Sequence, residues 1–349
     1  MEKSYSKAVK IWLFIGLVMI VIQILVGGIT RLTGSGLSIT KWDIVTGTIP
    51  PLNETQWAAE FDLYRETPQY QKINEGMSLG QFKFIFFWEY IHRLWARLMG
   101  FVFLFPFLYF LIRKKIDRPL MLRLAAVVGM AAVVALFGWI MVASGLVERP
   151  WVNAYKLTLH LNLALFLFAI LLHTWFYSLD PEHKSSYSSG LGMLLNVTLI
   201  LLIGQLILGG VMSGMKAGLY YPTWPDMNGQ LIPSLLLNSE NWSWSNFKLY
   251  DIEPIAPALT QFLHRLFAYT LTGLGIAVFV RGSRAGIVPQ YRLAVNIFFG
   301  VLIVQVLLGI LTVINCIGSI PLWLGVMHQL GAIALLSSIL YLRRITASA

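Results

Sequence analysis

The stretches EYIHRL at residues 89–94 and QFLHRL at residues 261–266 lie in the two halves of this 349-residue chain. In each stretch a histidine, His92 or His264, is followed by an arginine near the start of a long apolar segment. Two further histidines, His160 and His328, begin apolar segments at similar distances downstream. A polar side chain inside hydrocarbon costs free energy unless it has a partner, so it normally marks function. The sequence therefore predicts two equivalent sites, each built from a pair of intramembrane histidines.

The composition places the chain among integral membrane proteins. Hydrophobic residues make up 57% of it and charged residues only 12%, with a mean hydropathy of +0.70. A membrane-spanning helix needs about 20 apolar residues. Eight segments meet this need, near residues 11–29, 84–112, 124–143, 157–179, 191–212, 258–280, 293–314 and 322–342. They predict an all-α fold with eight transmembrane helices and leave no room for a large soluble domain.

The net charge of +10 indicates membrane topology rather than nucleic-acid binding. Fourteen Lys and Arg residues lie in the N-terminal segment, in the short loops that would share its side of the membrane, and in the C-terminal tail. The longer loops on the other side carry nine, offset by acidic residues. By the positive-inside rule, both termini are cytoplasmic and the loops at 30–83 and 213–257 face outward. We expect a multi-pass protein of the bacterial cytoplasmic (inner) membrane, in contact with lipid and not with nucleic acid.

An internal repeat divides the chain into two similar halves. Seven residues recur 182 positions later, namely Gln23, Gly27, Gly28, Gly36, Trp42, Gly47 and Pro51. The HRL tripeptide recurs 172 positions later. Four spans per repeat is an even number, so both halves keep one orientation in the membrane. We therefore predict two tandem, pseudo-symmetric four-helix bundles at residues 1–183 and 184–349, with the glycine pairs at close helix contacts or helix ends.

Haem is the group that best matches two histidine pairs in apolar surroundings. A haem in a four-helix bundle needs two neutral imidazoles from facing helices, apolar walls, and a basic residue for its propionates. Aromatic residues surround His92, and Arg93 and Arg265 adjoin the first histidine of each pair. Zinc or copper would be expected with cysteine or carboxylate ligands at a compact spacing. A lone histidine could be satisfied by a neighbouring hydroxyl or carbonyl, but four in a duplicated pattern favour haem.

Several longer stretches resemble the haem A synthase family. They are residues 27–39 with the continuation through Trp42 to Pro51, residues 82–93, the YPTWP segment at 221–225, and His328. The resemblance covers essentially the whole chain. Residues 64–68 and 77–79 of the first long loop are similar to the mitochondrial and proteobacterial branch. The pair of loop cysteines found in some members is missing, because Cys316 is the only cysteine.

The resemblance implies an oxidation. Members convert haem O to haem A for terminal oxidases by successive hydroxylations of the C8 methyl to a formyl group, with oxygen derived from water. The resemblance assigns His264 and His328 to the iron of haem b, a cofactor, and His92 and His160 to the iron of the substrate haem. It makes Glu89 the functional carboxylate. Haem O synthase is the implied upstream partner, and an unidentified electron acceptor completes the reaction.

Glu89 is also singled out by the residues themselves. Glu89 and His92 are three residues apart, so they share a face of one helix. The equivalent position in the second repeat is Gln261, which is neutral and similar in size. We infer that the first half does the chemistry and that the second half transfers electrons. Glu89 would accept a proton from water or stabilise a carbocation at the oxidised methyl; the alternative is a structural salt bridge to Arg93 or Lys83.

Two other classes of protein remain open at this point. A membrane electron-transfer cytochrome with two b haems would use all four histidines alike and would not need Glu89. A duplicated transporter would explain the repeat but not the histidine pairs. The haem content of the purified protein distinguishes the three. Haem b with haem O, haem A or a hydroxylated intermediate indicates the synthase, haem b alone indicates the cytochrome, and no haem indicates the transporter.

Overall fold

The computed structural model describes residues 5–41, 48–145, 149–181, 189–284 and 289–346. These residues form α-helices and short 3-10 helices, and no β-strand is found among them. The predicted all-α fold is thereby confirmed. Trp42 and Gly47 of the repeat lie outside the described residues, as does the predicted boundary between residues 183 and 184.

In the described part of the chain, eight helices are long and apolar enough to cross a membrane. They are α1 (Lys7–Leu32), α4 (Leu79–Ile112), α5 (Arg118–Gly145), α6 (Ala154–Leu179), α7 (Ser189–Gly214), α9 (Ile255–Arg284), α10 (Pro289–Ile314) and α11 (Leu322–Ile345). Their spans of 24 to 34 residues exceed the roughly 20 needed to cross the hydrocarbon layer. All eight predicted spans are confirmed, and seven of the helices begin before the apolar run that predicted them.

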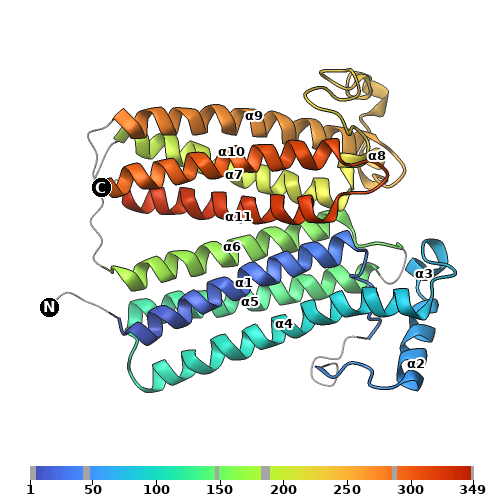
Figure 1. Cartoon of the computed structure of the whole chain (residues 1–349), viewed down its shortest axis with the longest axis horizontal. Helices are drawn as coiled ribbons and strands as arrows, with labels where there is room; N and C mark the ends of the chain where they lie inside the picture. The colour runs from blue at the N-terminus through green and yellow to red at the C-terminus, as the bar shows by residue number, and fades with distance from the viewer. Residues whose placement is uncertain (1–4, 42–47, 146–148, 182–188, 285–288, 347–349) are drawn as a thin grey trace. The chain divides into compact units, whose positions relative to one another are not determined.

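The helices group into two compact units, Lys3–Leu179 and Asp180–Ala349. In the first unit α1 packs against α4 and α6, and α5 packs against the same two helices. In the second unit α7 and α10 each pack against α9 and α11. Each unit is therefore a four-helix bundle, and the order of packing is the same in both (Figure 1). The histidine-bearing helices, α4 with α6 and α9 with α11, face each other across their bundles.

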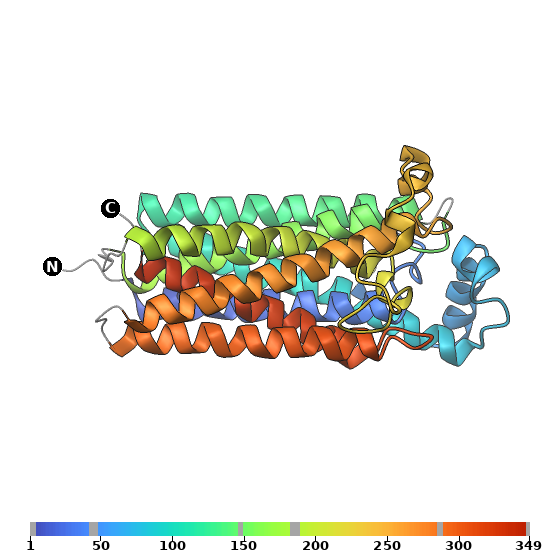
Figure 2. The ribbon, with the colours of Figure 1, turned by 90° about the horizontal axis from the view of Figure 1, so that it is seen from above.

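One end of the first unit is covered by the chain that follows α1. This segment forms α2 (Glu54–Arg65) and α3 (Pro68–Lys72). Phe61 and Tyr64 of α2 pack on Phe82 at the start of α4, with ring centroids 4.9 and 5.1 Å from that of Phe82. Figures 1 and 2 show α2 and α3 at the end of the unit opposite the start of α1. The aromatic cluster fixes this cap on the turns of α4 that lead to Glu89 and His92.

The corresponding cap of the second unit is built from shorter elements. They are η2 (Ala217–Leu219), η3 (Ser234–Leu236), η4 (Ser239–Asn241) and α8 (Trp244–Lys248). Leu236 of η3 packs on Ile255 and Ala258 in the first turns of α9. The Trp224–Pro225 peptide bond in this cap is cis. As in the first unit, a folded loop therefore covers the helix end that carries the His-Arg pair.

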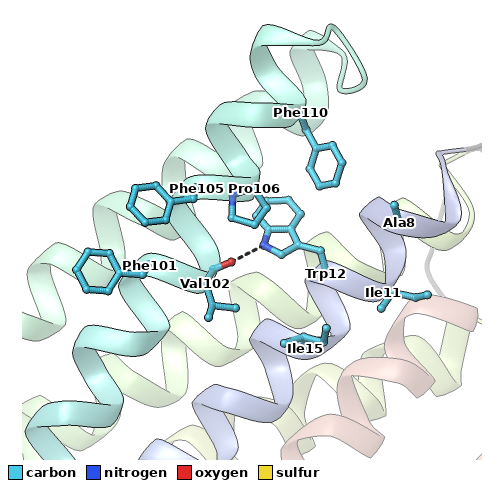
Figure 3. A pocket seen from close by; sticks show the side chains of 9 residues that line it. All are labelled: Ala8, Ile11, Trp12, Ile15, Phe101, Val102, Phe105, Pro106 and Phe110. Carbon is cyan, nitrogen blue, oxygen red and sulfur yellow. Dashed lines mark hydrogen bonds between the residues drawn. The ribbon is translucent and has the colours of Figure 1, made fainter.

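Pro106 interrupts the hydrogen bonding of α4. Proline has no N–H, so the carbonyl of Val102, four residues earlier, loses its partner within the helix. The indole Nε1 of Trp12, on α1, donates a hydrogen bond to this oxygen at 3.1 Å (Figure 3). The bond joins α1 and α4 beside an apolar groove of about 630 Å³ on the same two helices.

Candidate functional site

The four predicted histidines lie on four different helices. They are His92 on α4, His160 on α6, His264 on α9 and His328 on α11. Each imidazole lies against a glycine of a neighbouring helix, and a Cβ atom at that glycine would come within 2.8–3.5 Å of the ring carbon Cε1. These glycines are, in the same order, Gly27, Gly138, Gly209 and Gly309. A larger residue would push the imidazole aside at 2.8 Å, the distance found at Gly138. The close helix contacts predicted at Gly27 and Gly209 are confirmed.

The pair in the second unit has the spacing that a bis-imidazole haem requires. The ring centroids of His264 and His328 are 6.4 Å apart and the rings are inclined at 72°. An iron bound to two imidazole nitrogens, at about 2 Å from each, places the ring centroids about 6 Å apart. The residues present therefore fit a haem between α9 and α11.

In the first unit the orientation of His160 also suits an iron ligand. Its Nδ1 lies 3.1 Å from the carbonyl oxygen of Val134 on α5. A metal-binding histidine commonly donates its other ring N–H to a backbone carbonyl, which fixes the tautomer and the ring orientation. A proton on Nδ1 leaves the Nε2 lone pair of His160 for iron.

Glu89 is buried in the first unit, with 3% of its surface exposed, and each of its carboxylate oxygens accepts at least one hydrogen bond. Oε2 accepts hydrogen bonds from the Ser38 N–H at 2.7 Å, the Ser38 hydroxyl at 2.8 Å and the Ile39 N–H at 2.9 Å. Oε1 accepts a hydrogen bond from Arg93 Nη2 at 2.6 Å. Arg93 also donates to the carbonyls of Ile39 and Lys41. Glu89 and Arg93 thus tie the loop after α1 to the helix that carries His92.

This set of partners limits what Glu89 can do. Arg93 and the N–H groups of Ser38 and Ile39 can only donate, which is the environment of an ionised carboxylate. The fourth contact, the Ser38 hydroxyl, also lies 3.3 Å from the carbonyl oxygen of Ile85. The predicted ion pair with Arg93 is present, whereas Lys83 lies 5.2 Å from the ring of Trp57 instead. Because Oε2 already accepts three hydrogen bonds and Oε1 is held by the charge of Arg93, Glu89 is better suited to stabilise positive charge nearby than to take a proton from water.

The equivalent position in the second unit has the opposite surroundings. Gln261 Nε2 donates to the carbonyl of Tyr221 at 2.8 Å. Arg265 donates to the same carbonyl from Nη2 at 2.9 Å and to the carbonyl of Asp226 from Nη1 at 2.6 Å. The Oε1 atom of Gln261 has no hydrogen-bond partner among the described residues. The loop of the second unit therefore presents acceptors at the point where the loop of the first unit presents donors.

The side chain of Asp226 belongs to this loop rather than to the buried site. The Thr223 hydroxyl donates to its carboxylate at 2.7 Å and the Gly229 N–H does so at 3.2 Å. These bonds, with the nearby charge of Arg265, hold the pKa of Asp226 below its ordinary value. The side chain of Asp226 thus stabilises the turn, and the backbone carbonyl of the same residue accepts the hydrogen bond from Arg265.

Comparison with known proteins identifies the family of this chain. Residues 10–340 match the family described as COX15-CtaA, cytochrome oxidase assembly protein. The chain belongs to this family. It is 42% identical over 344 residues to the heme A synthase of Nitrosospira multiformis, covering 97% of this chain and 93% of the relative. It is 38% identical over 340 residues to that of Flavobacterium psychrophilum, covering 96% and 97%.

A third relative aligns with almost every residue of this chain. The heme A synthase of a Wolbachia species from Brugia malayi is 37% identical over 350 residues, with 99% of both chains covered. The family resemblance stated from the sequence is therefore confirmed. With eight apolar helices in the part of the chain that the structure describes, and with bacterial relatives, this chain is a multi-pass bacterial membrane protein.

Sequence reasoning missed several residues that contact the predicted site. Ser38 was not singled out, although its N–H and hydroxyl both bind Glu89. Gly138 and Gly309 were also missed, although each receives an imidazole of its unit. Gln23 and Gln205 were noticed as members of the repeat, yet no role was assigned to them. The constant spacing of the repeat was the available signal for the two glutamines, whereas nothing local marks Ser38.

Proposed function

We propose that this chain is a haem A synthase, a membrane-bound oxidoreductase of haem A biosynthesis. It oxidises the C8 methyl of haem O to the formyl group of haem A, the haem used in terminal oxidases. Each hydroxylation removes two electrons from the methyl carbon, adds an oxygen atom from water and releases two protons. The second hydroxylation gives a hydrate, which loses water to leave the aldehyde.

One observation carries the proposal: two otherwise equivalent histidine pairs differ in charge. Only the pair of the first unit has a fixed carboxylate, Glu89, one helical turn from its first histidine. A pair of haems that only exchange electrons would not need this difference. Relatives named heme A synthase at 42% and 38% identity over nearly the whole chain support the same conclusion. The two-haem cytochrome and the transporter have no comparable support.

In the second unit, residues 184–349, His264 and His328 hold haem b as the resident cofactor. When bound, this group accepts and passes on electrons one at a time. Arg265 fixes the loop over the site through two carbonyls, Tyr221 and Asp226. Both of these acceptors are neutral backbone carbonyls, so the guanidinium, which also acts on the carboxylate of Asp226, can offset an anionic propionate.

In the first unit, residues 1–183, His92 and His160 hold the iron of the substrate haem. The methyl carbon becomes positively charged as it loses electrons, and the fixed charge of Glu89 stabilises that state. Arg93 and the N–H groups of Ser38 and Ile39 keep the carboxylate in place during the reaction. This is electrostatic assistance by a group that does not have to move.

Both sites then lie near the outer side of the membrane, with both termini in the cytoplasm. The distribution of basic residues supports this orientation. Reporter fusions at Asp117 and Asn241 test it, since they should report opposite compartments. Haem O synthase is the expected partner, because a farnesylated porphyrin is poorly soluble and is best passed within the membrane.

The test of the function is co-expression with haem O synthase, followed by pigment extraction from the purified protein. A synthase will carry haem b together with haem O, haem A or a hydroxylated intermediate. Haem b alone would favour the two-haem cytochrome, and a protein without haem would favour the transporter. The variants His92→Ala and His264→Ala, purified in parallel, show which pigment depends on which unit.

A further inference from the structure

A second polar contact to the histidines occurs in both units. Gln23 Nε2, on α1, lies 3.4 Å from His92 Nε2. Gln205 Nε2, on α7, lies 3.3 Å from His264 Nε2. In each case the glutamine precedes the glycine that receives the imidazole by four residues, so the two share one helix face. The same amide-to-imidazole contact therefore arises twice, in two separately packed bundles.

The chemistry of the two groups fixes which atom donates. A side-chain amide nitrogen only donates hydrogen bonds, so the Nε2 atoms of His92 and His264 must be the acceptors. Their ring proton is then on Nδ1, and the lone pair is on Nε2. The Nδ1 atoms of both histidines and the Oε1 atoms of both glutamines are buried without a hydrogen-bond partner among the described residues. Each glutamine side chain therefore contacts the imidazole of its histidine only through the hydrogen bond from its amide nitrogen to Nε2.

An Nε2 lone pair on a neutral imidazole is also what haem iron binds. Iron and the amide N–H therefore compete for one lone pair. We propose that Gln23 and Gln205 are positioning residues that hold the lone pair of the axial histidine while no iron is bound, and release it to haem iron. In both units this inference rests on the proposed function.

The consequence differs between a substrate site and a cofactor site. A substrate haem has to leave after each turnover, and an internal hydrogen-bond donor that replaces the iron lowers the free energy of the emptied site. Gln23 has a second bond, from Nε2 to the carbonyl oxygen of His92 at 3.1 Å, which keeps the amide beside the ring. Gln23 therefore favours release of the product haem, whereas a resident haem b gains nothing from Gln205 once it is bound.

The test replaces the amide by a thioether of similar size, in Gln23→Met. Methionine cannot donate a hydrogen bond, so the emptied site keeps an unsatisfied imidazole nitrogen. Haem O should then bind about fivefold more tightly or more, the effect of about one lost hydrogen bond. The measurement is a titration of the full-length protein in detergent with haem O, followed by the Soret band of the low-spin form. Transfer of the bound haem to apomyoglobin, measured separately, should become slower.

Three controls make the result decisive. Gln71→Met changes an exposed glutamine of the outer loop and should bind haem O as the unaltered protein does. Gln205→Met should slow the loss of haem b to apomyoglobin without changing haem O binding. The haem b content of Gln23→Met reports folding of the chain, and Gln205→Met tests the same idea if Gln23→Met does not fold.

The outcomes separate this inference from the proposed function. Unchanged or weaker haem O binding by a Gln23→Met protein with normal haem b content would overturn the inference. Weaker binding would mean that the amide orients the ring for iron instead of competing with it. The proposed function predicts that the unaltered protein binds haem O and that His92→Ala abolishes this binding. If either result is not found, the proposed function itself fails.

Discussion

The loops that cover the two histidine sites show the clearest difference between the units. In the first unit, the loop after α1 directs two backbone N–H groups and a hydroxyl at Glu89. In the second unit, the loop after α7 directs the carbonyl of Tyr221 at Gln261. A carboxylate needs donors and an amide nitrogen needs an acceptor. The Glu-to-Gln difference between the repeats is therefore matched by a reversal in the polarity of the loop backbone.

The neighbouring arginines show what the two units have in common. Arg93 donates to the carbonyls of Ile39 and Lys41, and Arg265 donates to those of Tyr221 and Asp226. Both arginines join a loop to the helix that carries the histidine. The shared arginines therefore explain the shared architecture, and the carboxylate is the feature that only the first site has.

The largest expected effect separates the two histidine pairs. If His264 and His328 hold haem b as proposed, His264→Ala or His328→Ala removes one of its two protein ligands, so haem b should be lost almost completely from the purified protein. His92→Ala or His160→Ala should keep haem b and abolish haem A formation. Visible spectra and extracted pigments measure both. Equal loss of haem b from all four variants would remove the functional distinction between the units.

The next effect concerns Glu89→Gln. The loss of the fixed negative charge should reduce conversion of haem O to haem A by about 10²–10⁴-fold, the usual value of a group that assists at the reacting atom. Haem b content should remain, because the second unit is untouched. The amide nitrogen introduced by this substitution would face donors only, so some loss of stability in the first unit is also expected.

That loss of stability requires a control for the Glu89 prediction. Arg93→Lys keeps a cation beside Glu89 but removes the forked contact to the loop carbonyls. It should weaken the loop and leave most of the activity. Near-normal haem A from a well-expressed Glu89→Gln protein would reduce Glu89 to a structural partner of Arg93.

The reciprocal substitution, Gln261→Glu, tests the polarity of the second loop. A carboxylate at this position would face the carbonyl of Tyr221, which cannot donate a hydrogen bond, and the bond that the amide nitrogen makes there would be lost. We expect a loss of about 1–3 kcal/mol in the stability of the second unit, as for a buried acceptor without a donor. The temperature at which haem b is released measures it. If Gln261→Glu released haem b at the same temperature as the unaltered protein, the loop of the second unit would be able to turn a backbone N–H toward the new carboxylate.

Hydropathy and spacing were sufficient for part of this comparison. The eight spans follow from apolar runs that are long enough to cross a bilayer, and the four histidines stood out because polar groups are costly in such runs. The Glu89 and Gln261 pair was visible because the repeat aligns them. The ion pair with Arg93 was also foreseen as an alternative, since the two residues are one helical turn apart.

The polarity of the loops could not be foreseen. Whether Ser38 offers its N–H or its carbonyl to Glu89 depends on backbone dihedral angles that the loop adopts only when it is packed on α4. The partners lie 51 residues apart in sequence, so no local pattern links them. For the same reason the glycines that receive His160 and His328 were recognised only after the helices had been placed.

The smallest expected effect lies far along the helices from the histidines, at Trp12. In the first unit Pro106 leaves the Val102 carbonyl without a helical partner, and Trp12 supplies one. At the spacings of the repeat, the second unit has Leu194 and Val278 in place of Trp12 and Pro106, so its helix needs no such donor. Trp12→Phe should therefore destabilise the first unit by about 0.5–1.5 kcal/mol, the net value of one hydrogen bond.

A double-mutant cycle isolates that bond from the loss of indole packing. Pro106→Val restores an N–H that can reach the Val102 carbonyl, as in the second unit, so Trp12→Phe should cost less in that background. Thermal unfolding in detergent measures the four proteins, and haem b content should be the same in all of them. If Trp12→Phe costs the same with and without the Pro106→Val change, the indole acts by packing alone. The hydrogen bond from Trp12 would then contribute nothing measurable to the stability of the first unit.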